Sequence, residues 1–439
     1  MIVPIFTLDQ TEEYILIKVR APHADFQNLN VDLEERIFYF SSGSYFLKIE
    51  LTGDVKPGQD NITMKIDGEE LTFQLVKQVL GDRFPDLDML SKLLLSGKKA
   101  DKGSKIEDLS EPTYEINDLL FNWNQEIPKP PELLVSKGYP FGFASSKKID
   151  SLKNLHEDFI LALDITQPET LTTQEKLELK EENESEKFSH DHYISDFFLE
   201  GDENVHIVDT LTRQINFDFK PEFTKDEIHR MTVLSTLRLP LIDDEKRITI
   251  YLTLLDLLFA YSYDKRINGD DENTESGWNV VKLAASLSWM LEFYDIKEVV
   301  RSFLRRSICF PMMRNWQLSQ LVIQDVKHLL KSPHNKSWIL KYLLDCRSLL
   351  INYPGYFIFS SLFLDEYIVW VQNCASNVVL SSMLEALDKV VIKKGDFEKD
   401  FNIVKLERLA KKILEEEKLE AEKKNAQMTK EFDRLTITQ

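Results

Sequence analysis

Apolar and polar positions alternate along the first part of the chain. Ile15, Ile17 and Val19 lie two residues apart, which is the period of a half-buried β-strand. Asp67-Gly68, a strong hairpin signal, falls between two later runs of the same character. The further strand-like runs cover residues 36–40, 45–51, 62–66 and 71–76. Several short strands at this spacing predict an all-β sandwich that ends near residue 80.

The hydrophobic period changes to that of helices from about residue 224. Thr224 and Glu227 have the spacing of a capping box. Tyr251, Leu252 and Leu255 fall on one face of a helix. Similar stripes cover residues 278–293, 299–308, 316–330, 338–350 and 357–371. No repeat of fixed period is present, which argues against a solenoid. We therefore predict an α+β protein of two modules, a β-sandwich followed by a larger irregular all-α domain.

Polar stretches divide the chain between and within these modules. The run at 96–112 is rich in Gly, Ser, Lys and Asp, and Pro128, Pro130 and Pro131 hold the following chain extended. Residues 166–189 are nearly all polar or charged, which predicts a mobile, solvated acidic segment. The predicted boundaries are a β-sandwich at 1–82, a linker at 83–137, a helical domain at 138–420 and a charged tail at 421–439.

The charge balance narrows the choice of partner. Lys and Arg number 54 against 74 Asp and Glu, so the formal net charge is −20. This field repels polyanions and steers basic partners toward the chain. Direct nucleic-acid binding is disfavoured, because neutralising phosphates takes clustered Lys and Arg. A partner that is itself a basic RNA-binding protein fits the charge better.

Cys309, Cys346 and Cys374 are far apart and form no CxxC pair, which predicts reduced thiols in the cytosol or nucleus. The first residues lack the basic and long apolar regions of a signal peptide. The longest apolar stretch, 248–261, is too short to span a bilayer. We expect an intracellular protein without a membrane segment.

Motifs that carry chemistry are missing from the sequence. There is no phosphate loop, no GxGxxG, no GxSxG and no HExxH. His190-Asp191-His192 is the most metal-like cluster, but it has no distant ligands, and a solvent-facing loop explains it. We predict no catalytic residue, no cofactor and no metal, and hence no enzyme.

Three groups of side chains are candidates for partner contacts. Arg301, Arg305 and Arg306, with Arg314 soon after, would suit an anionic group, although salt bridges within an acidic protein are the favoured alternative. Five Trp residues lie in helical stripes and are mostly core, with one or two as anchors at a rim: Trp278, Trp289, Trp316, Trp338 and Trp370. The acidic run Asp270, Asp271, Glu272 and Glu275 suits a basic partner, although carboxylates before a helix also stabilise its dipole.

The helical region also carries phrases that resemble a known family. They are Thr274-Glu275-Ser276-Gly277-Trp278, Arg305-Arg306-Ser307-Ile308-Cys309-Phe310-Pro311 with Arg314 and Trp316, and Leu364-Asp365-Glu366-Tyr367-Ile368-Val369-Trp370. These resemble the Shq family of H/ACA ribonucleoprotein assembly factors, and the first residues resemble that family's CS domain, a co-chaperone sandwich. The chain departs from the family pattern at Ser44, Lys48 and Gly277-Trp278-Asn279.

The resemblance implies a specific partner. Such proteins hold dyskerin, the pseudouridine synthase of the H/ACA particle, before RNA joins, cover part of its RNA-binding surface, and are removed by the Reptin–Pontin ATPases. We accordingly expect a monomer of the nucleoplasm and cytoplasm. The expected partner-binding residues are Asp270, Asp271, Glu272, Glu275, Trp278, Arg305, Arg306, Arg314, Trp316, Asp365, Glu366 and Trp370.

Two other functions remain open at this stage. A general co-chaperone would use the CS sandwich to recruit a heat-shock ATPase and the helices to select many clients. An enzyme built on the helical domain would need titratable groups that converge in a pocket, and the sequence shows no such constellation.

Overall fold

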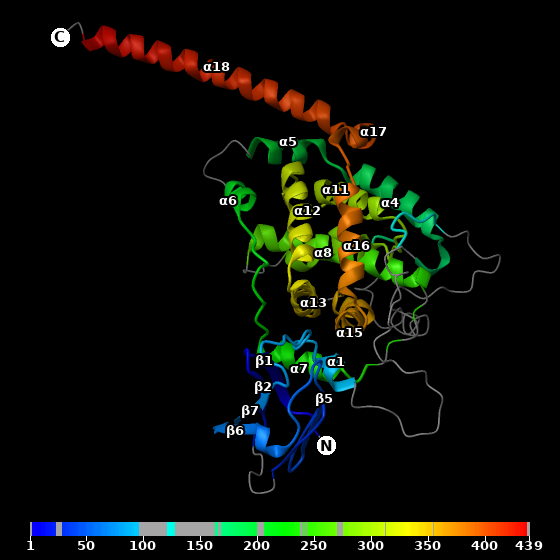
Figure 1. Ribbon diagram of the computed structural model, residues 1–439. Helices are drawn as coiled ribbons and strands as arrows, with labels where there is room; N and C mark the ends of the chain where they lie inside the picture. The colour runs from blue at the N-terminus through cyan, green and yellow to red at the C-terminus, as the bar shows by residue number, and fades with distance from the viewer. Residues whose placement is uncertain are drawn as a thin grey trace.

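The architecture was analysed in a computed structural model of the chain (Figure 1). The structure describes residues 2–22, 29–95, 121–127, 163–165, 168–199, 206–237, 239, 242, 244–269, 275–311, 313–353 and 355–436. The sequence pattern predicted a β-module followed by a helical region, and both are present in that order.

The β-module consists of two antiparallel sheets. One has the strand order β1-β2-β7-β6 and the other β3-β4-β5. The strands are β1 (Ile5–Gln10), β2 (Tyr14–Arg20), β3 (Asn30–Glu34), β4 (Ile37–Ser42), β5 (Tyr45–Glu50), β6 (Ile62–Asp67) and β7 (Glu70–Val76). The five predicted strand runs coincide with β2, β4, β5, β6 and β7, while β1 and β3 were not predicted.

The sandwich core follows from the alternation seen in the sequence. Ile17 pairs with Phe73 across β2 and β7, and both side chains are fully buried. Phe38 and Phe40 of the second sheet meet Phe73 with ring centroids 5.2 and 5.8 Å apart, so the two sheets share one aromatic core. The predicted hairpin joins β6 to β7, where Gly68 adopts a φ of 58° that favours glycine.

The rest of the described chain is mainly helical. The helices are α1 (Leu90–Leu95), α4 (Thr173–Lys187), α5 (His190–Leu199), α6 (His206–Thr212), α7 (Lys225–Leu234), α8 (Asp244–Asn268), α9 (Ser276–Leu283), α10 (Ala285–Ser288), α11 (Ile296–Cys309), α12 (Trp316–Lys331), α13 (Asn335–Ile351), α14 (Phe357–Phe359), α15 (Asp365–Asn373), α16 (Asn377–Lys389), α17 (Glu398–Phe401) and α18 (Ile403–Thr436). A π-helical turn, Ser360–Leu364, joins α14 to α15. In the part of the chain that the structure covers, no helix is both long and apolar enough to cross a membrane.

Helix α8 is the centre of the helical domain. It packs against α9, α11 and α12, the last two of which are labelled beside it in Figure 1, and almost every residue from Ile248 to Tyr263 is buried. Its one buried carboxylate among these, Asp256, accepts a 2.9 Å hydrogen bond from the Ser286 backbone N–H of α10. Burial raises the pKa of Asp256 to about 6. The core therefore contains an acidic group that the fold stabilises in its neutral form.

The β-module is attached to the helices by residues that the sequence pattern assigned to a linker. Phe84 packs so closely on Gly53 that a Cβ there would lie 2.5 Å from the ring. Helix α1 then packs against β5, α7 and α15. Its Ser91 is fully buried, and the Ser91 N–H donates a 2.9 Å hydrogen bond to Gln372 of α15. Residues 83–95 are thus part of the folded core, because apolar side chains there fill the junction between the modules.

A second part of the predicted linker is also packed. Trp123 is buried, stacks on Phe121 with centroids 5.5 Å apart, and donates a 3.0 Å hydrogen bond to Ser382 of α16. Its carbonyl accepts a 2.8 Å hydrogen bond from the Ile296 N–H at the start of α11. Pro128, Pro130 and Pro131 lie outside the described residues.

Replacing Leu93 tests whether α1 locks the two modules together. Leu93 is 1% exposed, so Leu93→Ala removes buried apolar contacts and leaves a cavity. We expect the free energy of unfolding to fall by about 2–5 kcal/mol. Leu80→Ala is the matched control, because Leu80 is 74% exposed and its loss should change stability by less than about 0.5 kcal/mol. Guanidinium unfolding measures both, and equal losses would contradict the structure.

Replacing Asp256 tests the raised pKa in α8. The folded pKa of about 6 lies above the ordinary value of 3.8, so the contribution of this group to stability is present at low pH and is lost as the pH rises through 6. Asp256→Asn keeps an acceptor for Ser286 and removes the titration. We expect the variant to be more stable at pH 7, by on the order of 2–3 kcal/mol, with no such gain at pH 4. Thermal melting across this pH range measures the difference, and a variant less stable at pH 7 would refute the assignment.

Candidate partner-binding surface

Helix α4 has a charged face buried and a charged face exposed. It begins with a complete capping box, in which Thr172 and Glu175 each accept from the other's backbone N–H. Lys176, Lys180 and Glu184, four residues apart, point inward and are buried. The prediction of a mobile, solvated segment at 166–189 is therefore wrong for α4. The segment has no apolar stripe, and its helix is held by ion pairs to other parts of the chain.

Three cations converge on Glu184. Its Oε2 accepts a 2.7 Å hydrogen bond from Arg305 Nε, and its Oε1 lies 3.2 Å from Arg306 Nη1 and 3.4 Å from Lys180 Nζ. All four side chains are fully buried. Burial alone would raise the pKa of Glu184, but Lys180, Arg306 and Arg305 hold it below its ordinary value. This ionic junction joins α4 to α11.

The two arginines extend the ionic junction to other elements. Arg305 also donates to Asp400 of α17 and, at 3.0 Å, to the Glu181 carbonyl of α4. Arg306 donates to Asp164 at 3.0 Å and to the Ser288 hydroxyl of α10 at 2.9 Å. Because every one of these acceptors belongs to the chain itself, Arg305 and Arg306 are not available to a partner. Their prediction as partner contacts is wrong, and the alternative of internal salt bridges is confirmed.

The remaining predicted contact residues fall in several places. Asp270, Asp271 and Glu272 lie outside the described residues. Glu275 is exposed just before α9, and Trp278 on α9 is half-buried.

Farther along the chain, Arg314 is 3.3 Å from Asp196 of α5, and Trp316 packs on Phe397 with centroids 5.7 Å apart. Both side chains are half-buried.

The phrase at the start of α15 splits between surface and core. Asp365 is half-buried and accepts a hydrogen bond from Arg347 of α13, and Glu366 beside it is also half-buried. Trp370 is buried and meets Tyr251 of α8 edge-on with centroids 4.7 Å apart. Trp370 is therefore a core residue and not a partner contact. The predicted contact residues that the structure describes are thus divided between the surface and the core.

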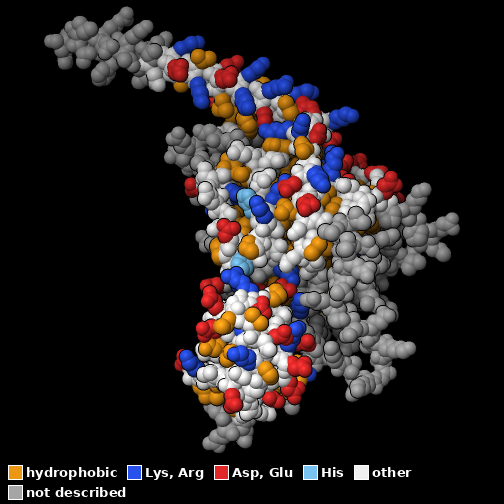
Figure 2. Space-filling view, in the orientation of Figure 1, with side chains coloured by type: hydrophobic (Ala, Val, Ile, Leu, Met, Phe, Trp, Pro, Cys, Tyr) orange, Lys and Arg blue, Asp and Glu red, His pale blue; other side chains and the backbone are white. Residues whose placement is uncertain are grey.

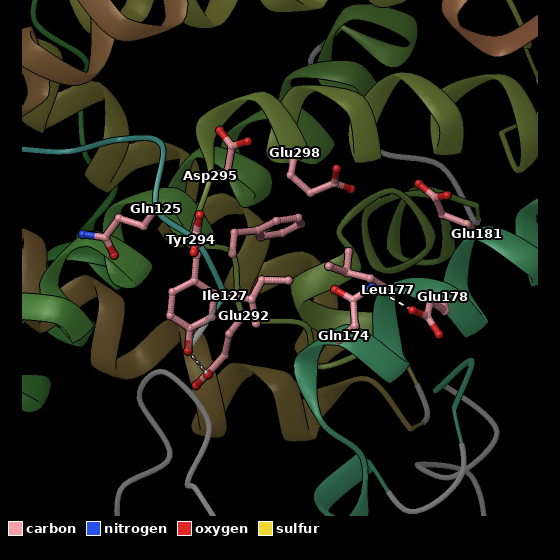
Figure 3. Close-up of a pocket in the computed structure, with 12 residues that line it drawn as sticks. Gln125, Ile127, Gln174, Leu177, Glu178, Glu181, Glu292, Tyr294, Asp295 and Glu298 are labelled. Atoms are coloured by element: carbon pink, nitrogen blue, oxygen red, sulfur yellow. Dashed lines mark hydrogen bonds between the residues drawn. The ribbon is translucent and has the colours of Figure 1, made fainter. Parts of the chain in front are cut away.

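The structure does contain an acidic cleft that the sequence did not predict. We define it by its lining residues: Gln125, Glu126, Ile127, Gln174, Leu177, Glu178, Glu181, Glu292, Phe293, Tyr294, Asp295 and Glu298. Its volume is about 560 Å³. Figure 3 shows these side chains around one opening, contributed by α4, the start of α11 and the segments that precede α11. The lining holds six Asp or Glu residues and no Lys, Arg or His.

Most carboxylates of the acidic cleft have a local role. Glu181 pairs with Arg301 at 3.1 Å, and Asp295 caps α11 by accepting from the Lys297 N–H at 2.9 Å. Glu178 accepts from Gln174 at 2.8 Å, and Glu292 accepts from the Tyr294 hydroxyl at 3.0 Å (Figure 3).

Glu298 differs from these carboxylates. Its Oε1 is buried and accepts no hydrogen bond from any residue that the structure describes. Burial, the largest cause, raises the pKa of Glu298 above its ordinary value.

The cleft belongs to a wider acidic surface. Glu175, Glu178, Glu182 and Glu186 are exposed on the outer face of α4, and Figure 2 shows acidic side chains gathered over this helix. Two of the three lysines of α4 point inward, so they do not neutralise this face. The signals that could have revealed α4 are its capping box and the i, i+4 spacing of its inward charges.

The metal-like motif of the sequence does not form a site. His190, Asp191 and His192 are exposed on the first turn of α5. Among the residues described, no group of three or more His, Cys, Asp or Glu side chains is placed to hold a metal ion.

Neutralising Glu184 tests the ionic junction. Glu184→Gln keeps the shape of the side chain but leaves Lys180, Arg305 and Arg306 buried with one carboxylate fewer. Removing one partner of a buried ionic group costs about 3–5 kcal/mol, and we expect a loss of unfolding free energy in that range. Glu182→Gln, on the exposed face of α4, is the matched control and should change stability by less than about 0.5 kcal/mol. Denaturant unfolding would contradict the assignment if the two variants behaved alike.

Comparisons with known proteins match both modules. Residues 3–94 match the family model described as SHQ1-like, CS domain, and residues 212–401 match the model described as SHQ1 protein, Shq1 domain. The first range contains the β-module and most of α1, and the second contains α7 to α17.

Relatives from animals and fungi align with nearly the whole chain. Protein SHQ1 homolog of Xenopus tropicalis is 29% identical, covering 95% of this chain and 71% of its own length. Protein SHQ1 homolog of Danio rerio is 28% identical, covering 95% of this chain and 72% of its own. Protein shq1 of Schizosaccharomyces pombe is 28% identical, covering 90% of this chain and 94% of its own. Two SHQ1 family models matched in order, together with SHQ1 homologues that align with 90% or more of the chain, show that the chain belongs to the Shq1 family.

Proposed function

We propose that the chain is an assembly chaperone that binds the dyskerin-type pseudouridine synthase of the H/ACA particle before RNA joins. In this role it covers the basic RNA-binding surface of the synthase. Membership of the Shq1 family supports an assembly-factor role in general terms. The synthase as partner extends that role, and release by the Reptin–Pontin ATPases in the nucleoplasm or cytoplasm is part of the same proposal.

The observation that carries the proposal is the orientation of charge on α4. Lys176 and Lys180 are buried, whereas four of the helix's glutamates are exposed on its outer face. A helix oriented the other way would present its cations to solvent. The net charge of −20 has the same sign as this face. Such a surface resembles a nucleic-acid backbone in charge and suits Lys and Arg side chains that otherwise contact phosphates.

The contact residues that remain in the proposal include Glu275 and Trp278 at the start of α9. The acidic run Asp270, Asp271 and Glu272, which lies outside the described residues, precedes them in sequence and stays in the proposal. Four further residues are half-buried and would contribute only to the edge of the partner-binding surface: Arg314, Trp316, Asp365 and Glu366. Binding and covering a surface needs no covalent step, so the proposal assigns no catalytic residue.

A general heat-shock co-chaperone is the alternative, and the match of residues 3–94 to a CS-domain model favours it. The two functions differ in the range of partners. A chaperone dedicated to one synthase co-purifies with a single stoichiometric basic protein, whereas a general co-chaperone co-purifies with many clients and a heat-shock ATPase. Purification of the native complex followed by mass spectrometry distinguishes them.

Competition with RNA tests the proposed function. We expect the full chain to bind the labelled synthase, to be excluded when guide RNA is bound first, and to associate more slowly as salt increases, because screening acts over about 8 Å at physiological ionic strength. Glu182→Gln with Glu186→Gln should slow association more than it speeds dissociation. The same charge removal at Glu415 and Glu416, exposed on α18, is the control. Stopped-flow fluorescence at two salt concentrations measures these rates.

Two results would count against the function. One is submicromolar RNA binding by this chain alone at physiological salt, since the chain would then not be a substitute for RNA. The other is a ternary complex in which the chain and RNA occupy the synthase together without mutual loss of affinity.

A further inference from the structure

The acidic cleft is a concave site and not a flat charged surface. Its volume of about 560 Å³ lies between α4 and the start of α11. Leu177 and Ile127, both half-buried, supply apolar contact surface among the carboxylates. One side is extended backbone, where the Gln125 N–H donates a 2.9 Å hydrogen bond to the Tyr294 carbonyl. Apolar walls with carboxylates between them suit the methylene stem and cationic head of a Lys or Arg side chain.

Glu298 provides a second and independent observation. The N-terminal turn of α11 stabilises carboxylates by itself, and Asp295 already serves as its cap. Glu298 Oε1, however, is buried without a hydrogen-bond donor from the described chain, although it lies beside the opening in Figure 3. The nearby cations have other partners, because Arg301 pairs with Glu181 and Lys180 pairs with Glu184. A buried acceptor of this kind costs free energy until a donor reaches it.

The spacing of the carboxylates decides which kind of cation fits. Nowhere in the described residues do three potential ligands converge closely enough to hold a metal ion. Six carboxylates spread around the opening instead match several cations that are spaced along a chain. RNA is excluded by the sign of the charge.

We propose that the acidic cleft binds an extended Lys- and Arg-containing segment of a partner protein, with one cationic side chain donating to Glu298. This inference rests on the proposed function only in taking the partner to be a basic protein. The cleft would bind an extended segment of the partner, and the outer face of α4 would contact the partner's folded domain.

The test uses the full chain and a short fluorescent peptide of alternating Lys and Ser. A peptide of alternating Glu and Ser is the ligand control. We expect the basic peptide to bind and the acidic peptide not to bind. Glu298→Gln combined with Glu178→Gln should weaken binding at least tenfold. Glu415→Gln combined with Glu416→Gln removes the same charge from α18 and should weaken it less than threefold. Fluorescence anisotropy measures the affinities.

A second readout separates binding from folding. Because Glu298 Oε1 is buried and has no donor among the described residues, Glu298→Gln should leave the melting temperature unchanged or raise it. Equal weakening of peptide binding by the cleft and α18 variants, or no binding by the wild type, would overturn the cleft proposal. Binding of the intact synthase is measured in parallel. If the wild type fails to bind the synthase while peptide binding depends on Glu298, the proposed function fails and the cleft assignment stands.

Discussion

Glu184 accepts from three buried cations, and the acidic outer surface of the helical domain depends on that interaction. Helix α4 has no apolar stripe with which to pack, so its attachment to α11 relies on a carboxylate inside the protein. Buried ion pairs are poor sources of net stability but they strongly specify geometry, since a mismatched arrangement leaves a charge unpaired. Here they fix which face of α4 is turned inward. The glutamates on the other face are exposed as a consequence, and one side of the acidic cleft is formed by the same helix.

The two modules are also joined by contacts between distant parts of the chain. Short segments with the composition of a linker pack there as part of the core. Helix α1 lies between β5 and the helices α7 and α15, and Trp123 reaches α16. A fragment that begins at residue 138 would lack both contacts and would expose the buried surfaces beneath them. The β-module is therefore held to the helical domain by α1, and Phe84, which packs on Gly53, fixes the chain that leads into α1 against the sandwich.

Local patterns in the sequence predicted the elements whose stability is local. The alternation around Ile17 and the stripe through Leu255 are strand and helix signals because one face of each element meets a core. Helix α4 was missed because its inward face is charged. Burying that face is stable only when Arg305 and Arg306, more than a hundred residues away in the sequence, neutralise Glu184. The acidic cleft was also missed because its parts are far apart in the sequence. Its walls come from residues 125–127, 174–181 and 292–298. The family phrases fall within the residues that match the Shq1-domain model, but several of their side chains, Trp370 among them, are buried in the core.

The charged inner face of α4 also constrains the order in which the chain folds. A helix without an apolar stripe gains little from early collapse, and isolated helices of this length are marginal in water. Glu184 of α4 gains its arginine partners only after α11 has formed. The docking of α4 therefore comes late, and local opening of the native protein is expected to begin there. A nascent or damaged chain consequently lacks the acidic face, so partner recognition is coupled to completion of the fold.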